Sequence, residues 1–322
     1  MSAAAQPVPV IACAEVEVTG VEDLSPTFRR VRLAGPELAE FSRDLIGDGD
    51  PVACRDAYLK LLLPPEGTEP TRPDLSMGYR GWFALPQEQR GYLRTYTARS
   101  ARWVELRGQV VPEVTLDFVL HAADQGPGGR WAANARPGDR TYLLGPGPGE
   151  SPWSAWGSGR ARRIVAVGDE TAVPALLSIV EELQAEEQPI DADVIMEVPL
   201  AEDLPLAESS PSVRVHALPR SETGAHGTGS VRELAHVLDL PTFCVADVLA
   251  GRRPERAVEA TATEATPLWE IADPRSERDT YVFLAGEAAS VKAWRRLCVD
   301  AAGIPKQNVS FMGYWRRGQA ES

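Results

Sequence analysis

Apolar residues follow two different patterns in the two halves of this chain. In the first half they recur in short segments bounded by Gly, Pro and charged residues, which is typical of β-strands joined by turns. These segments predict two strands within 13–33 and further strands at 58–63, 94–100, 103–107, 114–121 and 141–144. Short strands separated by turns favour a small antiparallel β-barrel or sandwich, and the Pro- and Gly-rich stretch 66–91 is expected to be a surface loop.

The pattern changes after residues 146–163, where Gly, Pro and Ser dominate and which we interpret as a linker. Beyond it, continuous apolar runs predict buried strands, and apolar residues at helical spacing predict helices between them. The predicted strands are 163–167, 192–198, 213–218 and 281–285, and the predicted helices are 171–184, 230–240 and 288–302. Strands that alternate with helices favour an α/β domain with a parallel sheet covered on both faces.

The length of 322 residues is sufficient for two hydrophobic cores. We therefore predict two domains, residues 1–150 with the antiparallel barrel and residues 151–322 with the parallel sheet. The segment 251–279 has little periodicity and is expected to be a mobile excursion from the second domain.

The composition limits the class of partner. A net charge of -13 argues against nucleic acid or an anionic membrane, so an anionic ligand would need a local cationic patch. No apolar run approaches the roughly 20 residues of a membrane span, and residues 1–10 lack a signal-peptide pattern. Four cysteines without a CxxC pair disfavour an iron–sulfur cluster and suit a reducing compartment, so a cytoplasmic location is expected. His216, His226 and His236 have no metal-site spacing, and no metal is predicted.

Residues 94–99, with the sequence RTYTAR, combine a cation, an aromatic ring and hydroxyl groups in one short strand. A guanidinium can bind a pyrophosphate bidentately, an aromatic face can lie against a flavin ring, and a hydroxyl can reach the ring nitrogen. Side chains alternate along a strand, so Tyr96 and Thr97 can reach one ligand only if the strand ends or twists here. An ordinary strand of Thr, Tyr and Arg is the alternative.

Two acidic turns join predicted strands to helices in the second half, at 168–174 and at 286–289. A doubly wound sheet binds nucleotides at such turns, because the N–H groups of the helix start face the ligand. Both turns contain small residues that allow a ring to approach, although the G-x-G-x-x-G fingerprint is absent. The alternative is that Asp169 and Glu170 only cap the helix.

Two further segments could bind ligands. The strand that ends at His121 leads into a glycine-rich turn at 126–129, where converging N–H groups could hold an anion. His121 could equally be a hydrogen-bonded structural residue. Cations on the helix 288–302 and the aromatic and cationic stretch 313–317 could bind an anionic or aryl-rich ligand. The alternative is a solvated helix face and a frayed tail.

Together, the segments 94–99, 117–121, 126–132, 135–139, 168–176, 285–296 and 313–318 resemble the siderophore-interacting protein family. These are FAD-dependent ferric-siderophore reductases related to ferredoxin–NADP reductases. The resemblance implies an FAD-binding barrel over 1–150 and an NAD(P)H-binding α/β domain over 151–322, with a siderophore cleft formed by the C-terminal segment. The chain departs from the family pattern at Ala122, where Gly is common, and at Gly128 and Gly129, where Ala-Ser is more usual.

The resemblance also implies roles for single residues. Arg94 would bind the FAD phosphate, Tyr96 would stack on the flavin ring, Thr97 would hydrogen-bond near its reactive nitrogen, and Arg220 would bind a 2′-phosphate. The expected FAD contacts are Arg94, Thr95, Tyr96, Thr97, Asp117, His121, Gly128, Gly129, Arg130, Trp131 and Ala132. The expected nucleotide contacts are Asp169, Thr171, Ala172, Arg220, Gly286 and Glu287, and the expected siderophore contacts are Lys292, Trp315 and Arg316.

The implied activity is electron transfer from NADPH, NADH or a ferredoxin, through FAD, to Fe(III) held by a siderophore. Oxygen-donor chelators hold the hard Fe(III) more strongly than Fe(II), so one electron loosens the metal. Two alternatives stay open: a flavin reductase that supplies an oxygenase, and a siderophore-binding flavoprotein without catalysis. The sequence does not distinguish between the electron donors, the siderophores or the oligomeric states.

Overall fold

A computed structural model describes residues 10–47, 52–65, 67–76, 78–120, 126–204, 206–252, 269–273 and 279–318. The chain divides into two compact units. Unit 1 contains Met1–Asp23 and Arg29–Ser154, and unit 2 contains Leu24–Phe28 and Ala155–Ser322. The short segment Leu24–Phe28 belongs to unit 2 because Ser25 and Thr27 donate hydrogen bonds to the buried carboxylate of Asp203.

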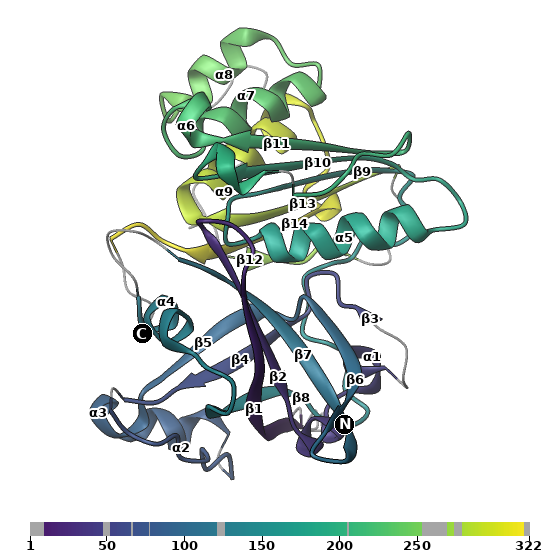
Figure 1. The fold of residues 1–322 in the computed structure, drawn as a ribbon. Coiled ribbons are helices and arrows are strands. Elements are labelled where there is room, and N and C mark those ends of the chain that lie inside the picture. The colour runs from purple at the N-terminus through teal and green to yellow at the C-terminus, as the bar shows by residue number, and fades with distance from the viewer. Residues whose placement is uncertain are drawn as a thin grey trace, which may run out of the picture. The chain divides into compact units, whose positions relative to one another are not determined.

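Unit 1 is built on one antiparallel sheet (Figure 1), as the pattern predicted. Its strands are β1 (Ile11–Asp23), β2 (Phe28–Ala34), β3 (Val52–Ala53), β4 (Tyr58–Leu63), β5 (Tyr92–Thr97), β6 (Ser100–Leu106), β7 (Gln109–Val119) and β8 (Arg140–Pro146). The strand order is β3-β6-β7-β2-β1-β8-β4-β5. In the described part of unit 1, β3 and β5 are therefore end strands, and the sheet does not close into the predicted barrel.

The helices of unit 1 are short. They are the 3₁₀ helix η1 (Pro36–Glu40) and the α-helices α1 (Arg43–Ile46), α2 (Tyr79–Ala84), α3 (Gln87–Arg90) and α4 (Pro127–Asn134). Helices α2 and α3 lie within the stretch 66–91 that we predicted to be a surface loop, so that prediction was wrong in part. Pro and Gly interrupt the helical segments, which is why no periodicity was visible.

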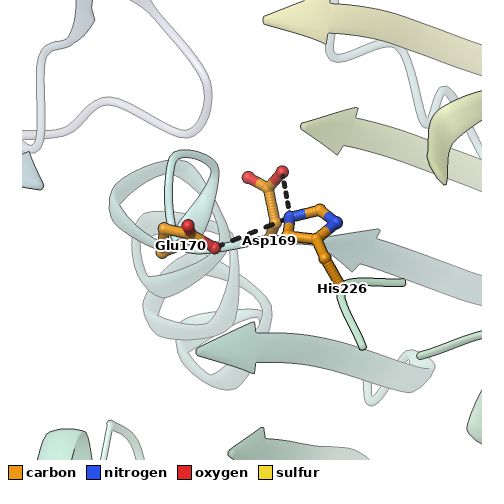
Figure 2. A group of neighbouring side chains, drawn as sticks. All are labelled: Asp169, Glu170 and His226. Atoms are coloured by element: carbon orange, nitrogen blue, oxygen red, sulfur yellow. Dashed lines mark ion pairs between the residues drawn. The ribbon is translucent and has the colours of Figure 1, made fainter. Parts of the chain in front are cut away.

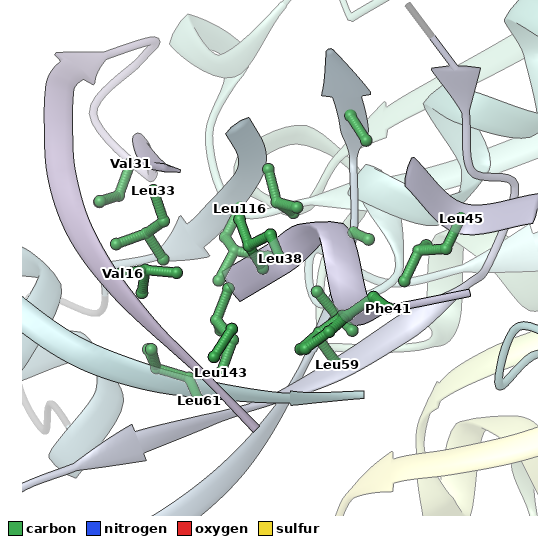
Figure 3. Close-up of a cluster of buried hydrophobic side chains, with 14 of the residues drawn as sticks. Val16, Val31, Leu33, Leu38, Phe41, Leu45, Leu59, Leu61, Leu116 and Leu143 are labelled. Carbon is green, nitrogen blue, oxygen red and sulfur yellow. The ribbon is translucent and has the colours of Figure 1, made fainter. Parts of the chain in front are cut away.

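The core of unit 1 follows from alternation along the strands. In β4, Leu59, Leu61 and Leu63 point inward, and in β1 Val16 does the same. Side chains from η1 and α1 complete this core, which Figure 3 shows as a continuous apolar cluster. The labelled members are Val16, Val31, Leu33, Leu38, Phe41, Leu45, Leu59, Leu61, Leu116 and Leu143.

Unit 2 contains a six-stranded sheet in the order β11-β10-β9-β13-β14-β12. Its strands are β9 (Arg163–Gly168), β10 (Asp191–Val198), β11 (Val213–Pro219), β12 (Trp269–Glu270), β13 (Thr280–Glu287) and β14 (Val309–Trp315). The first five strands of the order pair in parallel, as predicted, and only β12 pairs antiparallel, with β14. The predicted excursion 251–279 therefore contains an edge strand; its residues 253–268 and 274–278 lie outside the described residues.

Helices cover both faces of this sheet, with α5 on one face and α7, α8 and α9 on the other (Figure 1). The helices are α5 (Val173–Ala185), α6 (Arg220–Thr223), α7 (Thr228–Val237), α8 (Thr242–Leu249) and α9 (Ala288–Arg296). Short helical turns are η2 (Ala201–Asp203), η3 (Leu297–Ala301) and η4 (Lys306–Asn308). Leu234, Trp294 and Phe311 are buried in the apolar layer between α7, α9 and the sheet.

The predicted linker 146–163 is packed rather than extended in solvent. Trp153 contacts Tyr58 in unit 1, with ring centroids 5.9 Å apart. Trp156 contacts Tyr281 and Phe283 in unit 2, with centroids at 5.0 and 5.6 Å. Polar and small residues surround Trp153 and Trp156 in the sequence, so the periodicity of apolar residues did not indicate that these two side chains are packed.

Across the described residues, every helix is too short or too polar to cross a bilayer.

Candidate functional site

The predicted flavin-binding residues lie on β5 and alternate between its two faces. Arg94 and Tyr96 project from one face, and Thr95 and Thr97 from the other. Thr95 is exposed and accepts a hydrogen bond from Lys60 Nζ at 3.1 Å, whereas Thr97 is buried. The strand ends at Thr97, so the condition under which Tyr96 and Thr97 can reach one ligand is met.

Tyr96 packs against Phe118 on one side and the first turn of α4 on the other. The ring centroids of Tyr96 and Phe118 are 4.4 Å apart, and Trp131 of α4 lies 5.6 Å from Phe118. A Cβ atom at Gly128 would lie 1.7 Å from the Tyr96 hydroxyl oxygen. Only glycine at position 128 therefore lets this hydroxyl approach the helix.

The glycine-rich segment after His121 is the start of a helix, and this corrects the predicted turn. Gly126 is the N-cap of α4 and Pro127 its first residue, and no side chain of the described residues caps this end. The N–H groups of Gly128 and Gly129 belong to the first turn, which has no intrahelical acceptors. The N–H group of Arg130 makes the first intrahelical hydrogen bond, to the Gly126 carbonyl at 3.1 Å.

Arg94 adds a positive charge on the face of β5 that carries Tyr96. Its guanidinium carbon lies 4.9 Å from the centroid of the Tyr92 ring, and its Nη1 donates to the Leu93 carbonyl at 3.1 Å. The side chain is only partly buried. Arg130 is exposed on the first turn of α4, and Arg94 lies two residues before Tyr96, whose hydroxyl contacts that turn.

Other predicted FAD contacts have partners within unit 1. Arg30 donates from Nε and Nη2 to the two carboxylate oxygens of the buried Asp117, at 2.7 and 2.8 Å. Ala132 is buried, and its carbonyl accepts a hydrogen bond from Arg29 Nη1 at 3.1 Å. These contacts fix β2, β7 and α4 to one another. His121 lies outside the described residues.

The residues of unit 1 fit a dinucleotide phosphate. The start of α4 has no cap among the described side chains, and the buried Gly128 lies directly against the Tyr96 hydroxyl. A helix N-terminus attracts anions because its N–H groups carry partial positive charge. Arg94 and Arg130 supply full charges for the same purpose.

In unit 2, the two acidic turns meet where the strand order changes direction. β9 is followed in space by β10 and β11 on one side and by β13 and β14 on the other. Asp169 follows β9 and Glu287 ends β13, and both side chains are buried. Ligands of doubly wound sheets bind at this type of position, outside the carboxyl ends of the strands.

Asp169 connects three segments through its carboxylate. Oδ2 accepts hydrogen bonds from the Glu287 N–H at 2.7 Å and from Trp315 Nε1 at 3.0 Å. Oδ1 accepts from the N–H and the hydroxyl of Thr171, at 3.0 and 2.6 Å. Ala172 is buried at the start of α5 behind this turn. Trp315, which we predicted to contact the siderophore, has its indole N–H bound to this acid.

Gly286 is required by the same carboxylate. Its φ angle is +145°, and a Cβ atom there would lie 2.7 Å from Asp169 Cγ. Glu287, the next residue, caps α9 by accepting hydrogen bonds from the N–H groups of Ala289 and Ser290, at 2.7 and 3.1 Å. Of the acidic residues in the two turns, Glu287 thus has the capping role that we considered as an alternative for Asp169 and Glu170.

Glu170 forms a bidentate ion pair with Arg220, with nitrogen–oxygen distances of 2.6 and 2.8 Å. Arg220 also lies 3.7 Å from Glu197, which is fully buried and accepts hydrogen bonds from Gly227 and Ser230. Burial lowers the pKa of Arg220, but its pairing with Glu170 outweighs this and the net pKa is raised. The guanidinium already has a carboxylate partner, so a 2′-phosphate would have to compete with Glu170. The phosphate role stays a prediction.

His226 joins this group, although the sequence analysis assigned it no role. Its Nε2 lies 3.3 Å from Asp169 Oδ2 and 3.9 Å from Glu170 Oε2, and Figure 2 shows these two contacts. Its Nδ1 lies 3.2 Å from Ser290 Oγ, and its ring meets Trp315 edge to face at 5.6 Å. His226 lies two residues before the start of α7 and far along the chain from Asp169, so no motif joins the two.

The pKa values of this pair shift in opposite directions. Burial raises the pKa of Asp169, but hydrogen bonds from His226 and Thr171 outweigh it, so the net pKa is lowered. Burial lowers the pKa of His226, but Asp169 outweighs it, so the net pKa is raised. Both shifts favour an imidazolium–carboxylate pair.

Asp169, Glu170 and His226 place ligand atoms within 4.8 Å of one another, a spacing that a small cation could use. The carboxylate of Asp169 already accepts several N–H and O–H donors, and that of Glu170 is bound to Arg220. We therefore interpret the group as a network of ion pairs and hydrogen bonds.

The other predicted siderophore contacts are exposed. Lys292 lies on α9 and Arg316 directly after β14, both on the surface of unit 2. The neighbouring Arg317 N–H lies 3.3 Å from Glu287 Oε1, so the end of β14 lies beside the start of α9. The stretch 313–317 is therefore largely strand, and the frayed tail is excluded as its interpretation up to residue 315.

Two family models match the chain. Residues 17–150 match the siderophore-interacting FAD-binding domain, and residues 161–318 match the siderophore-interacting protein domain.

Among relatives, the ferric vibriobactin reductase of Vibrio cholerae is 26% identical over 300 residues, which cover 92% of this chain and 87% of that protein. A siderophore utilization protein from T. fusca is 25% identical, with a TM-score of 0.60 and coverage of 96% of this chain and 95% of that one. A ferredoxin–NADP+ reductase from Neisseria gonorrhoeae shares the fold, with a TM-score of 0.54 at 13% identity and coverage of 94% and 99%.

Proposed function

The chain belongs to the siderophore-interacting protein family, and we propose that it is an FAD-dependent reductase of ferric siderophores that uses NADPH or NADH as electron donor. The main structural support for this proposal is the start of α4 in unit 1. A helix N-terminus without a cap among the described side chains, with Tyr96 against it, lies in the FAD-binding match, which also includes Arg94. The reductase activity named for the vibriobactin relative supports the same conclusion.

In this proposal, the residues of unit 1 bind and orient the cofactor. The N–H groups of Gly128 and Gly129, with Arg94, hold its diphosphate. Tyr96 lies along the ring system, and Thr97, at the end of β5, lies near the ring nitrogen. A bound flavin supplies the conversion between hydride transfer and single-electron transfer.

Unit 2 would bind the nicotinamide nucleotide. Asp169 and Gly286 lie at the carboxyl ends of β9 and β13, where a parallel sheet of this order binds nucleotides. The reaction balances when one reduced nucleotide gives two electrons and one proton, and two Fe(III) chelates each take one electron. The fold shared with the ferredoxin–NADP+ reductase supports the nucleotide, while a ferredoxin is the competing donor.

The ferric siderophore would be bound with the help of Lys292 and Arg316. Both are exposed cations in a chain with a net charge of -13, so they could attract an anionic chelate locally. These two residues need only hold the chelate within electron-transfer distance.

All four cysteines are free thiols, which suits our proposal of a cytoplasmic location.

The test is an anaerobic reaction of the purified protein with one component omitted at a time. We expect flavin in the preparation, bleaching by NADPH or NADH, and Fe(II) captured by a chromogenic chelator only when a ferric siderophore is present. Bleaching without Fe(II) would instead indicate a flavin reductase. A preparation that neither contains nor takes up flavin would contradict the proposal.

A matched pair of variants tests the siderophore contact. Arg316→Ala should raise the KM for an anionic ferric siderophore and leave the reduction of a small neutral acceptor unchanged. Lys306→Ala removes an exposed cation at the opposite end of β14 and should change neither reaction. Equal loss in both reactions with Arg316→Ala would remove the assignment.

A further inference from the structure

His226 is a buried titratable residue beside the carboxylate that closes the nucleotide end of the sheet. Its side chain is 8% exposed, and its Nε2 lies 3.3 Å from the fully buried Asp169. The three segments that contact the imidazole are the Asp169 turn, the start of α9 through Ser290, and the end of β14 through Trp315. These contacts fix the position of the imidazole.

The charged groups around the imidazole, among the described residues, are four carboxylates and one guanidinium. Glu170 is neutralised by Arg220, and Glu197 lies 3.7 Å from the same guanidinium. Glu287 is bound to the N–H groups that begin α9. Asp169 has His226 as its cationic partner, so the proton on His226 changes the charge at this end of the sheet by one unit.

We propose that His226 is a positioning residue whose proton sets the preference of the site between the oxidised and the reduced nicotinamide ring. The inference rests on the proposed function, since it takes a nicotinamide nucleotide as the ligand at Asp169. The oxidised ring is a cation and the reduced ring is neutral. An unbalanced Asp169 attracts the cation, and an Asp169 paired with the imidazolium does not.

The direction of the titration follows from the contacts. Asp169 raises the pKa of His226 against the effect of burial, so the imidazolium persists to higher pH than in a free histidine. At lower pH the imidazolium offsets the charge of Asp169, so the site favours the oxidised ring less. As the pH rises through the titration of His226, the affinity for the oxidised form should increase relative to the reduced form.

The experiment measures this ratio on the flavin-loaded full chain by titration calorimetry. One ligand is NADP+ and the other is its 1,4,5,6-tetrahydronicotinamide analogue, which has a neutral ring and cannot donate hydride. Both carry the same phosphates, so the titration of the phosphates cancels in the ratio. Between about pH 6 and about pH 9 the preference for NADP+ should increase roughly tenfold in the unmodified protein.

His226→Gln keeps a hydrogen-bond donor but cannot become charged. This variant should show the high-pH preference at every pH, and the ratio should be flat. The matched control is His236→Gln, at an exposed position on α7, which should retain the pH dependence of the unmodified protein. If His226→Gln does not fold, Ser290→Ala keeps the imidazole, removes its contact at Nδ1 and should shift the midpoint of the titration.

Two outcomes overturn the inference and differ from each other. A ratio that is independent of pH in the unmodified protein, or equally dependent on pH in His226→Gln, contradicts the role of His226 while nucleotide binding stands. Binding of neither nucleotide at any pH, tested also with NAD+ and its analogue, removes the nicotinamide donor from the proposed function and this inference with it.

Discussion

The two candidate regions satisfy their charged groups in different ways. In unit 1, Arg94 is partly exposed, and Arg130 is exposed on the first turn of α4, whose start no described side chain caps. In unit 2, Asp169 and Glu170 are buried and bound by donors from distant segments. Substitutions in the first region should therefore affect ligand binding, and substitutions in the second should affect folding as well.

The largest effect is expected for Asp169→Asn. The amide cannot accept all the hydrogen bonds that the carboxylate accepts from Thr171, Glu287 and Trp315, and His226 loses its counter-ion. Loss of one partner of a buried ion pair should lower the free energy of unfolding by about 3 kcal/mol. Denaturant unfolding followed by tryptophan fluorescence measures this change.

The control for this variant is Asp191→Asn, in the same unit. The Asp191 side chain is 56% exposed, although it also pairs with arginines, Arg163 and Arg214. An exposed pair of this kind should contribute less than about 1 kcal/mol. Similar losses in the two variants would show that burial of Asp169 is not what distinguishes this region.

A smaller loss is expected for Gly286→Ala. The new Cβ would lie 2.7 Å from Asp169 Cγ, at a φ angle of +145°, so the Asp169 turn must move. We expect a loss of about 2 kcal/mol, measured by thermal unfolding, together with weaker nucleotide binding.

Gly318→Ala separates the effect of φ from that of contact. Gly318 also has a positive φ, +76°, but none of the described residues has an atom within 4 Å of its Cβ position. This variant should lose at most about 1 kcal/mol. If Gly286→Ala loses no more stability than Gly318→Ala, the close approach of Asp169 to position 286 does not affect the stability of the protein.

In unit 1, the matching test is Gly128→Ala. The Cβ would lie 1.7 Å from the Tyr96 hydroxyl, so the ring or α4 must shift. Flavin affinity should fall roughly tenfold, about 1.4 kcal/mol, with a smaller change in the stability of the unit. The measurement is flavin retention after gel filtration and fluorescence titration of the stripped protein.

Two companions sharpen this test. Gly126→Ala adds a methyl group with no atom of the described residues within 4 Å and should retain flavin. Gly128→Ala combined with Tyr96→Phe removes the clashing oxygen and should recover part of the affinity. Flavin loss in Gly126→Ala as large as in Gly128→Ala would mean that the contact with Tyr96 is not the cause.

The same contrast explains what the sequence could predict. The strand with Tyr96 and the parallel sheet follow from local patterns, since each buried strand, such as β9, is a continuous apolar run. The edge strand β12 has only two residues and β14 contains Gly and Ser, so neither gave a strong signal. The open sheet of unit 1 depends on which strands pair, and strand pairing is not encoded in any single segment.

The site in unit 2 was predictable only in part. The motifs identified Asp169 and Glu287 at strand ends, because a strand-to-helix turn is local. They gave no indication that Asp169 is buried, since acids at a turn are usually exposed. His226 could not be found, because its contacts to Asp169 and Ser290 come from the folding of three distant segments.

The smallest effect concerns the pH dependence of stability. Because the net pKa of His226 is raised in the folded state, its pair with Asp169 stabilises the fold fully below the unfolded value of about 6.5. This contribution is lost as the pH rises through the raised pKa. The difference in unfolding free energy between the unmodified protein and His226→Gln should therefore shrink with rising pH, by up to about 1 kcal/mol. Denaturant titrations at several pH values measure it, with His236→Gln as the control; a difference that grows with pH would mean that His226 is held neutral in the folded chain.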